Sequence, residues 1–298
     1  MSSKQVILIT GSSTGFGRLF AETLARQGHT VFASMRDLGG KNAKNAAELL
    51  ALAERESLAI HTVELDVTSD ASVENAVRSV VTQAGRIDVA INNAGYSIAS
   101  LMEAITTQQA QQIFDTNFFG ALRVNRSVLP HMRRQRSGVL IHISSGAGRL
   151  VFPSFGMYCA SKFAMEAAAE AYRYELAAQG IESVIVQPGA YETPILGKFL
   201  AGADASRTET YGPLANVPEM LYATLGRTAG NAQEVADAVL RIVETPAGQK
   251  RLRYRVSPSD IGVDAINESA ARVQASLLKA FGLAEMTAFS QQKAAASD

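Results

Sequence analysis

The sequence predicts an α/β protein with a single doubly wound parallel sheet flanked by helices. Short apolar runs of strand length recur along the chain, and longer amphipathic segments separate them. Strands that alternate with helices form a parallel sheet that is covered on both faces. A glycine-rich turn joins the first apolar run to the first amphipathic segment, and sheets of this class place such a turn there.

The first half of the chain alternates regularly between the two kinds of segment. Residues 6–9 form an unbroken apolar run, the glycine turn follows, and an amphipathic stretch continues to Gln27 and is closed by Gly28. The other strands expected in this half are residues 30–34, 60–65 and 89–92, and the other helices are residues 41–57 and 70–84.

The second half keeps this pattern only as far as Pro188. Within it, the pattern predicts helical structure over residues 107–136 and 158–179 and strands at residues 139–143 and 183–186. Residues 190–230 contain no clear strand and are too long for an ordinary connection, so we expect a substrate lid within an extended C-terminal substrate-binding region. A helix (233–244), a basic strand (251–256), an amphipathic helix (262–281) and a flexible tail (287–298) complete the expected elements.

Length and composition narrow the possible functions. A chain of 298 residues that is 47% apolar can bury a large core, and we expect one catalytic domain over residues 1–298. The 28 basic and 28 acidic side chains leave no net charge to attract nucleic acid or an anionic membrane. Cys159 is the only cysteine, which excludes an internal disulfide and favours the cytoplasm. The four scattered histidines predict no metal site.

The glycine-rich turn has the context of a phosphate-binding loop. Glycines let the backbone approach a pyrophosphate, and the start of the following helix offers free N–H groups. The spacing G-x-x-x-G-x-G departs from G-x-G-x-x-G, and a plain turn that packs the helix on the strand is the alternative. The context favours dinucleotide binding, for which the candidate residues are Gly11, Ser13, Gly15, Phe16 and Gly17.

The end of the second strand indicates which dinucleotide is preferred. Enzymes that use NAD present a carboxylate to the adenosine ribose there, and Met35 occupies that position. Arg36 follows with a guanidinium suited to a 2′-phosphate. We therefore expect NADP(H), although Asp37 keeps NAD(H) possible and Arg36 could instead be a surface charge paired with Asp37.

Tyr158 and Lys162 form a candidate proton-transfer pair. Residues i and i+4 share one face of a helix, so the ammonium of Lys162 is expected near the phenol of Tyr158. A nearby cation lowers the pKa of a phenol from its usual value near 10. This spacing alone is weak evidence, because a core tyrosine and a surface lysine give the same pattern.

The ordered set of motifs resembles the short-chain dehydrogenase/reductase family. The set contains the glycine turn, Asn92-Asn93-Ala94-Gly95, Asn117, Ser145, Tyr158-x-x-x-Lys162 and Pro188-Gly189, and it covers about the first two thirds of the chain. Residues 33–38 and 158–164 look most like the 17β-hydroxysteroid and retinol dehydrogenase branch. The resemblance implies a Rossmann-type fold, a nicotinamide cofactor and a homodimer or homotetramer.

The resemblance also implies roles for the catalytic residues. Tyr158 would protonate a carbonyl oxygen during reduction, and Ser145 would hold that oxygen, with Ser144 as the adjacent competitor. Lys162 would lower the pKa of Tyr158 and bond the nicotinamide ribose. Asn117 would hold a water that links Lys162 to solvent.

Further positions are implied to surround the cofactor. Asp66 and Val67 resemble a pair that contacts adenine, and Asn92 would mainly bond neighbouring strands. Thr193 would bond the carboxamide of the nicotinamide. The remaining implied cofactor residues are Asn93, Ala94, Gly95, Pro188 and Gly189.

The side chains expected to line a substrate cavity are mostly apolar. They predict a small lipophilic ketone or secondary alcohol as the substrate. Several of them could instead merely pack the insertion, residues 190–230, against the sheet. The main candidates besides Ser145 are Tyr96, Phe152, Phe155 and Tyr191, with Ile98, Val151, Phe199, Leu214 and Met220 as further lining residues. The alternative to an oxidoreductase is a dinucleotide-binding sensor or scaffold that performs no turnover.

Overall fold

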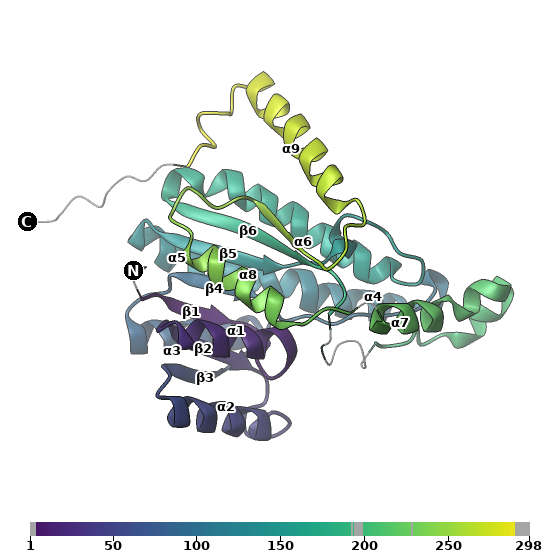
Figure 1. The fold of residues 1–298 in the computed structure, drawn as a ribbon, viewed down its shortest axis with the longest axis horizontal. Coiled ribbons are helices and arrows are strands. Elements are labelled where there is room, and N and C mark those ends of the chain that lie inside the picture. The colour runs from purple at the N-terminus through teal and green to yellow at the C-terminus, as the bar shows by residue number, and fades with distance from the viewer. Residues whose placement is uncertain (1–3, 192, 194–198, 228, 290–298) are drawn as a thin grey trace, which may run out of the picture.

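The computed structural model describes residues 4–191, 193, 199–227 and 229–289. These residues form a seven-stranded parallel sheet in the order β3-β2-β1-β4-β5-β6-β7, with helices on both faces (Figure 1). The predicted doubly wound architecture is therefore confirmed. The strand order reverses direction between β1 and β4, and ligands of such sheets bind outside the carboxyl ends of the strands at this point.

The elements of the first half lie within two residues of their expected bounds. The strands are β1 (Val6–Ile9), β2 (Thr30–Met35), β3 (Ile60–Glu64) and β4 (Val89–Asn92). The helices between them are α1 (Gly15–Arg26), α2 (Ala43–Glu56) and α3 (Asp70–Ala84).

The core divides into two layers because successive side chains of a strand point to opposite faces. Ile7 and Ile9 of β1 pack on one face with Phe20 of α1, and helices α1, α2 and α8 (Gln233–Glu244) contribute to this layer. Leu8 packs on the other face with Val128, in a layer to which α3 and α5 (Gly120–Gln135) contribute. Strands buried on both sides explain why the sequence shows continuous apolar runs.

The helical region predicted over 107–136 is interrupted. It consists of α4 (Thr107–Phe114), a π-helical turn (Asp115–Phe119) and α5. The following elements are β5 (Gly138–Ile143), α6 (Gly156–Glu175) and β6 (Ile181–Pro188). Single-turn π-helices occur often at functional sites, and this one contains Asn117.

The region after β6 contains helices that the sequence patterns did not predict. Residues Ala205–Asn216 form 3₁₀ turns with a kink, and Val217–Arg227 form α7. Residues 192, 194–198 and 228 of the predicted lid, and residues 290–298 of the predicted tail, lie outside the described residues. The last strand, β7 (Arg253–Val256), is followed by α9 (Val263–Ala280), which projects from the body of the molecule in Figure 1. No helix in the described part of the chain is long and apolar enough to cross a bilayer.

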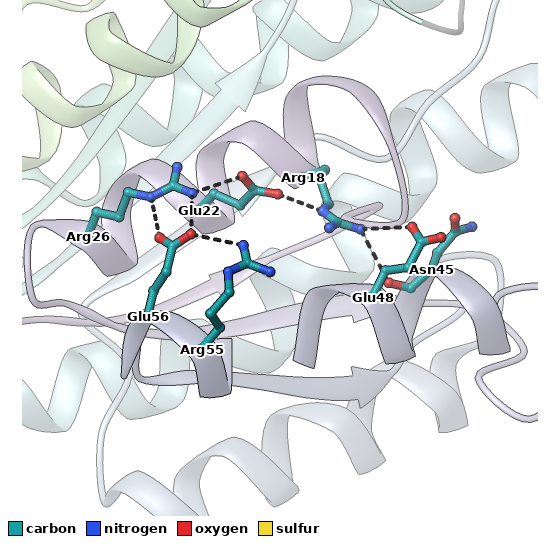
Figure 2. A network of polar contacts seen from close by, with 7 residues as sticks. All are labelled: Arg18, Glu22, Arg26, Asn45, Glu48, Arg55 and Glu56. Carbon is teal, nitrogen blue, oxygen red and sulfur yellow. Dashed lines mark hydrogen bonds and ion pairs between the residues drawn. The ribbon is translucent and has the colours of Figure 1, made fainter. Parts of the chain in front are cut away.

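A network of charged side chains joins α1 to α2 on the surface (Figure 2). Arg26 Nε donates to Glu56 at 2.8 Å, and Arg18 Nε donates to Glu22 at 2.7 Å. Arg18 also lies 3.8 Å from Glu48 of α2. Ion pairs at the surface add little stability individually. Their clearest effect is to link the helix that follows the glycine turn to the helix that follows Arg36.

Candidate active site

The glycine turn lies against the carboxyl end of β4, and two of its glycines are required by the geometry. Gly11 has a φ of +69°, and a Cβ there would approach the Cα of Ala94 to 2.9 Å. A Cβ on Gly17 would meet the carbonyl oxygen of Gly11 and, at 2.6 Å, the side-chain nitrogen of Asn93. The turn and the β4 loop therefore pack in direct backbone contact.

Thr10 and Asn93 fasten these two loops together. The hydroxyl of Thr10 accepts hydrogen bonds from the N–H groups of Asn93 and Ala94, both at 3.0 Å. The side chain of Asn93 donates to the carbonyls of Thr10 at 2.8 Å and Gly11 at 3.0 Å. Asn93 thus holds the shape of the loop with its own amide group.

The start of α1 fits a phosphate group. Thr14 stands at the helix N-cap, yet its side chain caps no N–H group of the helix. Uncapped N–H groups and the helix dipole favour an anion at this position. Ser13 and Gly15 lie in the same turn, whereas the ring of Phe16 stacks on Phe20.

The end of β2 presents one exposed cation. Met35 is buried, and the side chain of Arg36 is 62% exposed, with Asp66 as a distant partner at 3.9 Å. The carboxylate of Asp37 accepts a hydrogen bond from the N–H of Lys41 at 2.8 Å. The structure therefore pairs Arg36 with Asp66 and gives Asp37 a role in its own loop.

The other predicted cofactor residues line the same edge of the sheet. The carboxylate of Asp66 accepts from the backbone and hydroxyl of Thr68 at 2.9 and 2.8 Å, and Val67 is buried. Pro188 ends β6, and the N–H of Gly189 bonds β7 through the carbonyl of Val256. Gly95 faces two of the predicted catalytic residues, since a Cβ there would lie 3.0 Å from Asn117 Oδ1 and 3.8 Å from Lys162 Nζ. Thr193 is half-buried.

Helix α6 places Tyr158 and Lys162 on one face, as their spacing predicted. The ammonium of Lys162 lies 5.7 Å from the centre of the Tyr158 ring. It donates a hydrogen bond at 2.8 Å to the carbonyl of Ile143, the last residue of β5. Lys162 is buried, and this burial lowers its pKa to about 8.

The expectation that the phenol is made more acidic is not met. Burial raises the pKa of Tyr158 to about 12, and a hydrogen bond with Ser145 acts in the opposite direction. The reason is that the ammonium of Lys162 points to Ile143 while apolar side chains surround the phenol. Tyr158 is therefore a protonated phenol at neutral pH, which is the form that can donate a proton.

The adjacent serines at the end of β5 have different environments. Ser144 is buried and its hydroxyl donates to Glu166 at 2.7 Å. Ser145 is half-buried, accepts from the N–H of Ala147 at 3.2 Å and bonds Tyr158. Of the two serines, Ser145 is the one that the structure brings to the phenol.

Asn117 lies on the π-helical turn and joins the Tyr96 backbone to Ser161 of α6. Its side-chain oxygen accepts from the N–H of Tyr96 at 3.0 Å, and its amide donates to the carbonyl of Tyr96 at 2.9 Å. The same amide donates to the hydroxyl of Ser161 at 3.1 Å. Both amide hydrogens are thus used within the protein, and the expected water link to solvent stays a prediction.

Part of the predicted substrate lining gathers around Tyr158. Tyr96 and Ile98 share one apolar cluster with it, and Phe152 shares another. Phe155 makes edge-to-face contacts with Tyr158, at 6.4 Å between ring centres, and with Phe199, at 5.2 Å. These aromatic and aliphatic groups form an apolar surface beside the phenol.

The remaining predicted lining residues in the described part of the chain are not members of these two clusters. Tyr191 is buried in the sheet core against Phe16, and its hydroxyl donates to Glu234 at 3.2 Å. Its aromatic character in the insertion suggested the substrate, but its packing gives it a role in the core. Val151, Leu214 and Met220 are exposed by 69%, 51% and 64%.

Comparison with known proteins identifies the family of this chain. Residues 5–203 match the family described as short chain dehydrogenase. The chain belongs to the short-chain dehydrogenase family. This match includes the glycine turn, Asn117, Ser145, Tyr158 and Lys162.

Two curated relatives of this short-chain dehydrogenase differ in how much of the chain they match. A 3-ketodihydrosphingosine reductase from Bacteroides thetaiotaomicron is 39% identical over 63% of this chain and 65% of its own length. The chain thus spans slightly less than two thirds of that reductase. Human retinol dehydrogenase 8 is 33% identical over 86% of this chain and 84% of its own length.

Solved structures of short-chain dehydrogenases have the same fold. One from Streptomyces avermitilis superposes with a TM-score of 0.76 at 28% identity and covers 94% of this chain and 98% of its own. A variant actinorhodin polyketide ketoreductase crystallised with NADPH has a TM-score of 0.73 at 26% identity, with coverages of 88% and 99%. Such cofactor-bound neighbours support a nicotinamide cofactor for this family member.

Sequence reasoning missed several polar residues that hold the site together. Thr10 fastens the glycine turn, and Ser161 passes a hydrogen bond from Asn117 to the carbonyl of Tyr158 at 2.7 Å. Glu166 and Gln187 are buried, and the side-chain amide of Gln187 donates to Glu166 at 2.9 Å, on the helix that carries Tyr158 and Lys162. Glu166 could have been found from its spacing, since it lies four residues beyond Lys162 on the same helix face.

Proposed function

We propose that this short-chain dehydrogenase is an NADP-dependent oxidoreductase for a lipophilic ketone or secondary alcohol. The observation that carries the proposal is that Tyr158, Ser145 and Lys162 converge at the edge of the sheet that holds the glycine turn. A bound nicotinamide would supply or accept the hydride. The residues of the chain would bind the cofactor, orient the substrate and manage the proton.

The proton chemistry follows from the environment of each group. Tyr158, with its raised pKa, is protonated at neutral pH and would donate to the carbonyl oxygen during reduction. The hydroxyl of Ser145 would bond the same oxygen as negative charge develops on it. The ammonium of Lys162, 5.7 Å from the centre of the phenol ring, would lie beside the phenolate that remains, while its hydrogen bond goes to the carbonyl of Ile143.

The preference for NADP rests on Arg36. Its guanidinium is exposed and its acidic partner is 3.9 Å away, so a 2′-phosphate could recruit it. Met35 is buried and carries no carboxylate for a ribose hydroxyl, while the carboxylate of Asp37 already accepts a hydrogen bond from the N–H of Lys41. Comparing kcat/KM for NADPH and NADH tests this preference, and equal values would contradict it.

The apolar surface beside Tyr158 supports a lipophilic substrate. Ile98 and Phe155 are buried next to the phenol, and Phe199 brings the insertion onto Phe155. The insertion is attached there by the backbone, because Leu200 bonds Ser97 and Ala99. Relatives named for retinol and 3-ketodihydrosphingosine are consistent with this substrate class.

Assembly into a homodimer or homotetramer is part of the proposal. On α6, the residues Ala160, Phe163, Ala167 and Ala171 form an exposed stripe of small and apolar side chains. An open hollow of about 820 Å³ beside it is lined by Phe114, Phe119 and Met157, among others. A helix pair from a second copy would cover both.

The decisive experiment measures NADPH oxidation with a panel of lipophilic ketones. We expect turnover by the wild-type protein and a loss of at least about 10²-fold in Tyr158→Phe, because the general acid is removed. NADPH binding, measured by fluorescence titration, should survive in the variant. Tight binding of NADPH without turnover across the panel would favour the alternative, a dinucleotide-binding sensor or scaffold.

A further inference from the structure

A buried carboxylate lies directly behind the proposed catalytic pair. Glu166 follows Lys162 by one turn of α6 and is only 2% exposed. Because residues i, i+4 and i+8 share a helix face, Tyr158, Lys162 and Glu166 form one row along α6. Burying a carboxylate is costly unless hydrogen bonds and a cation compensate it. The hydrogen-bond donors and the cation around Glu166 therefore identify the elements that this carboxylate joins.

These partners come from residues at or next to three neighbouring strands, β5, β6 and β7. The hydroxyl of Ser144, at the end of β5, donates to Glu166 at 2.7 Å. The amide of Gln187, from β6, donates to both carboxylate oxygens, at 2.9 and 3.1 Å. Arg253 Nε, from β7, donates at 3.1 Å and forms a buried ion pair. Two of these donors adjoin proposed site residues, since Ser144 precedes Ser145 and Gln187 precedes Pro188.

We propose that Glu166 is a positioning residue: it fixes the ends of β5 and β6 against α6, and its negative charge supports the ammonium of Lys162. This inference rests on the proposed oxidoreductase function. Through Ser144 it places Ser145 opposite Tyr158, and through Gln187 it places the Pro188–Gly189 edge. It touches neither of the groups proposed to react.

The charges around Lys162 make Glu166 important for its protonation. His142 of β5 is buried with a pKa lowered to about 3, so it is neutral, and Asn117 and the Ile143 carbonyl carry no net charge. Burial lowers the pKa of Lys162, and the carboxylate of Glu166 is the group that raises it. Without this charge the ammonium would lose its proton at a lower pH.

Glu166 is itself surrounded by other charges. Arg253 bonds both Glu166 and, at 2.6 Å, Glu170 on the next turn of α6. Arg149 also lies within electrostatic range of both carboxylates, and Tyr174 donates to Glu170 at 2.8 Å. Glu170 therefore shares the cation with Glu166 but makes no bond to Ser144 or Gln187, which makes it a matched control.

The test compares Glu166→Gln with Glu170→Gln and Glu166→Asp. In ketone reduction, kcat/KM should fall as pH rises through the pKa of Lys162, near 8 in the wild type. Glu166→Gln should move this alkaline limb down by about one pH unit or more, because the supporting charge is gone. Glu166→Asp keeps the negative charge, so the alkaline fall of kcat/KM should stay at the wild-type pH. The same is expected of Glu170→Gln. A loss at every pH in Glu166→Gln without movement of the alkaline limb would show that the charge of Glu166 does not support the ammonium of Lys162 and would overturn the proposal.

A second measurement does not depend on turnover. The side-chain ¹³Cε signal of Lys162, assigned with Lys162→Met, should titrate near pH 8 in the wild type and lower in Glu166→Gln. An unchanged titration overturns the inference even if the enzyme is active. A shifted titration in a protein without turnover supports the inference and rejects the proposed function. If Glu166→Gln does not fold, Glu166→Gln/Arg253→Gln removes both charges of the pair and takes its place.

Discussion

Ser144 and Ser145 are adjacent in the sequence but contact different groups of the candidate site. Ser144 faces the buried carboxylate of Glu166, and Ser145 faces the phenol of Tyr158. Residues next to each other at the end of a strand point to opposite sides, so one backbone segment serves both sides of the sheet edge. Substitutions of the two serines should therefore have different effects.

Ser145→Ala should lower kcat for ketone reduction by about 10²-fold while leaving thermal stability close to that of the wild type, because one donor to the developing oxyanion is lost. Ser144→Ala should instead lower the unfolding free energy by roughly 1.5–3 kcal/mol, because a buried charged group loses a hydrogen bond. Steady-state kinetics and urea denaturation of both variants measure the contrast. The same effect from both substitutions would show that the two positions are not separated.

At the scale of elements, the ends of parallel strands and the breaks in helices create the site. The π-helical turn between α4 and α5 directs Asn117 inward, where it joins the Tyr96 backbone to Ser161 of α6. Strand β5 contributes a buried histidine, His142, beside Asn92 of β4. The protonation of this histidine should make the stability of the folded protein depend on pH.

His142 should make the folded state less stable in acid. Its pKa is lowered from 6.5 to about 3 by burial and by Lys162, so the unfolded chain takes up a proton below pH 6.5 that the folded protein does not. The unfolding free energy should fall between pH 6.5 and about 3, by roughly 1.4 kcal/mol per pH unit. Urea denaturation of wild type and His142→Gln at several pH values isolates this slope as their difference. Parallel pH profiles would show that His142 titrates normally.

Sequence patterns predicted the sheet well because each strand carries its own signal. The apolar runs at β1 and β4 need only to be buried, and burial is expressed in local composition. The interruption at Asn117 depends instead on Tyr96 and Ser161, which are distant in sequence. The helical turns of the insertion likewise depend on contacts with the β4–α4 segment, such as Arg207 with Glu103 at 2.9 Å.

Sequence patterns could indicate only those contacts of the candidate site that are made between residues close together along the chain. The Tyr158–Lys162 spacing is local and was visible in the sequence, but the direction of the Tyr158 pKa was not, because burial is a property of the whole fold. The partner that compensates Glu166 lies 87 residues away in Arg253. No local pattern connects these two residues before β7 is placed beside β6.

At the scale of the whole molecule, the outer face of α6 is the surface that we propose for self-association. Its exposed stripe contains Phe163, Ala167 and Ala171, and Phe119 is 47% exposed nearby on the π-helical turn. Small residues on helices allow close packing of a second helix. A large charged side chain in the stripe should therefore prevent assembly.

Ala167→Arg should convert a dimer or tetramer to smaller species, because the charged side chain would be buried between helices. Sedimentation velocity of the wild type and the variant measures the change. Ala51→Arg introduces the same side chain at an exposed position of α2 and should leave the assembly intact. If Ala167→Arg has the wild-type sedimentation coefficient, α6 is not the interface.

The position of β7 late in the sequence determines when the polar network of Glu166 can form during synthesis by the ribosome. Six of the strands and the whole of α6 leave the exit tunnel before Arg253, so the nascent chain carries a carboxylate whose cation has not yet been made. Asn267 arrives later still and donates to Gln187 at 2.7 Å. The strands around the glycine turn can therefore pair early during synthesis, while the polar network of Glu166 is completed only after β7 and α9 have been made.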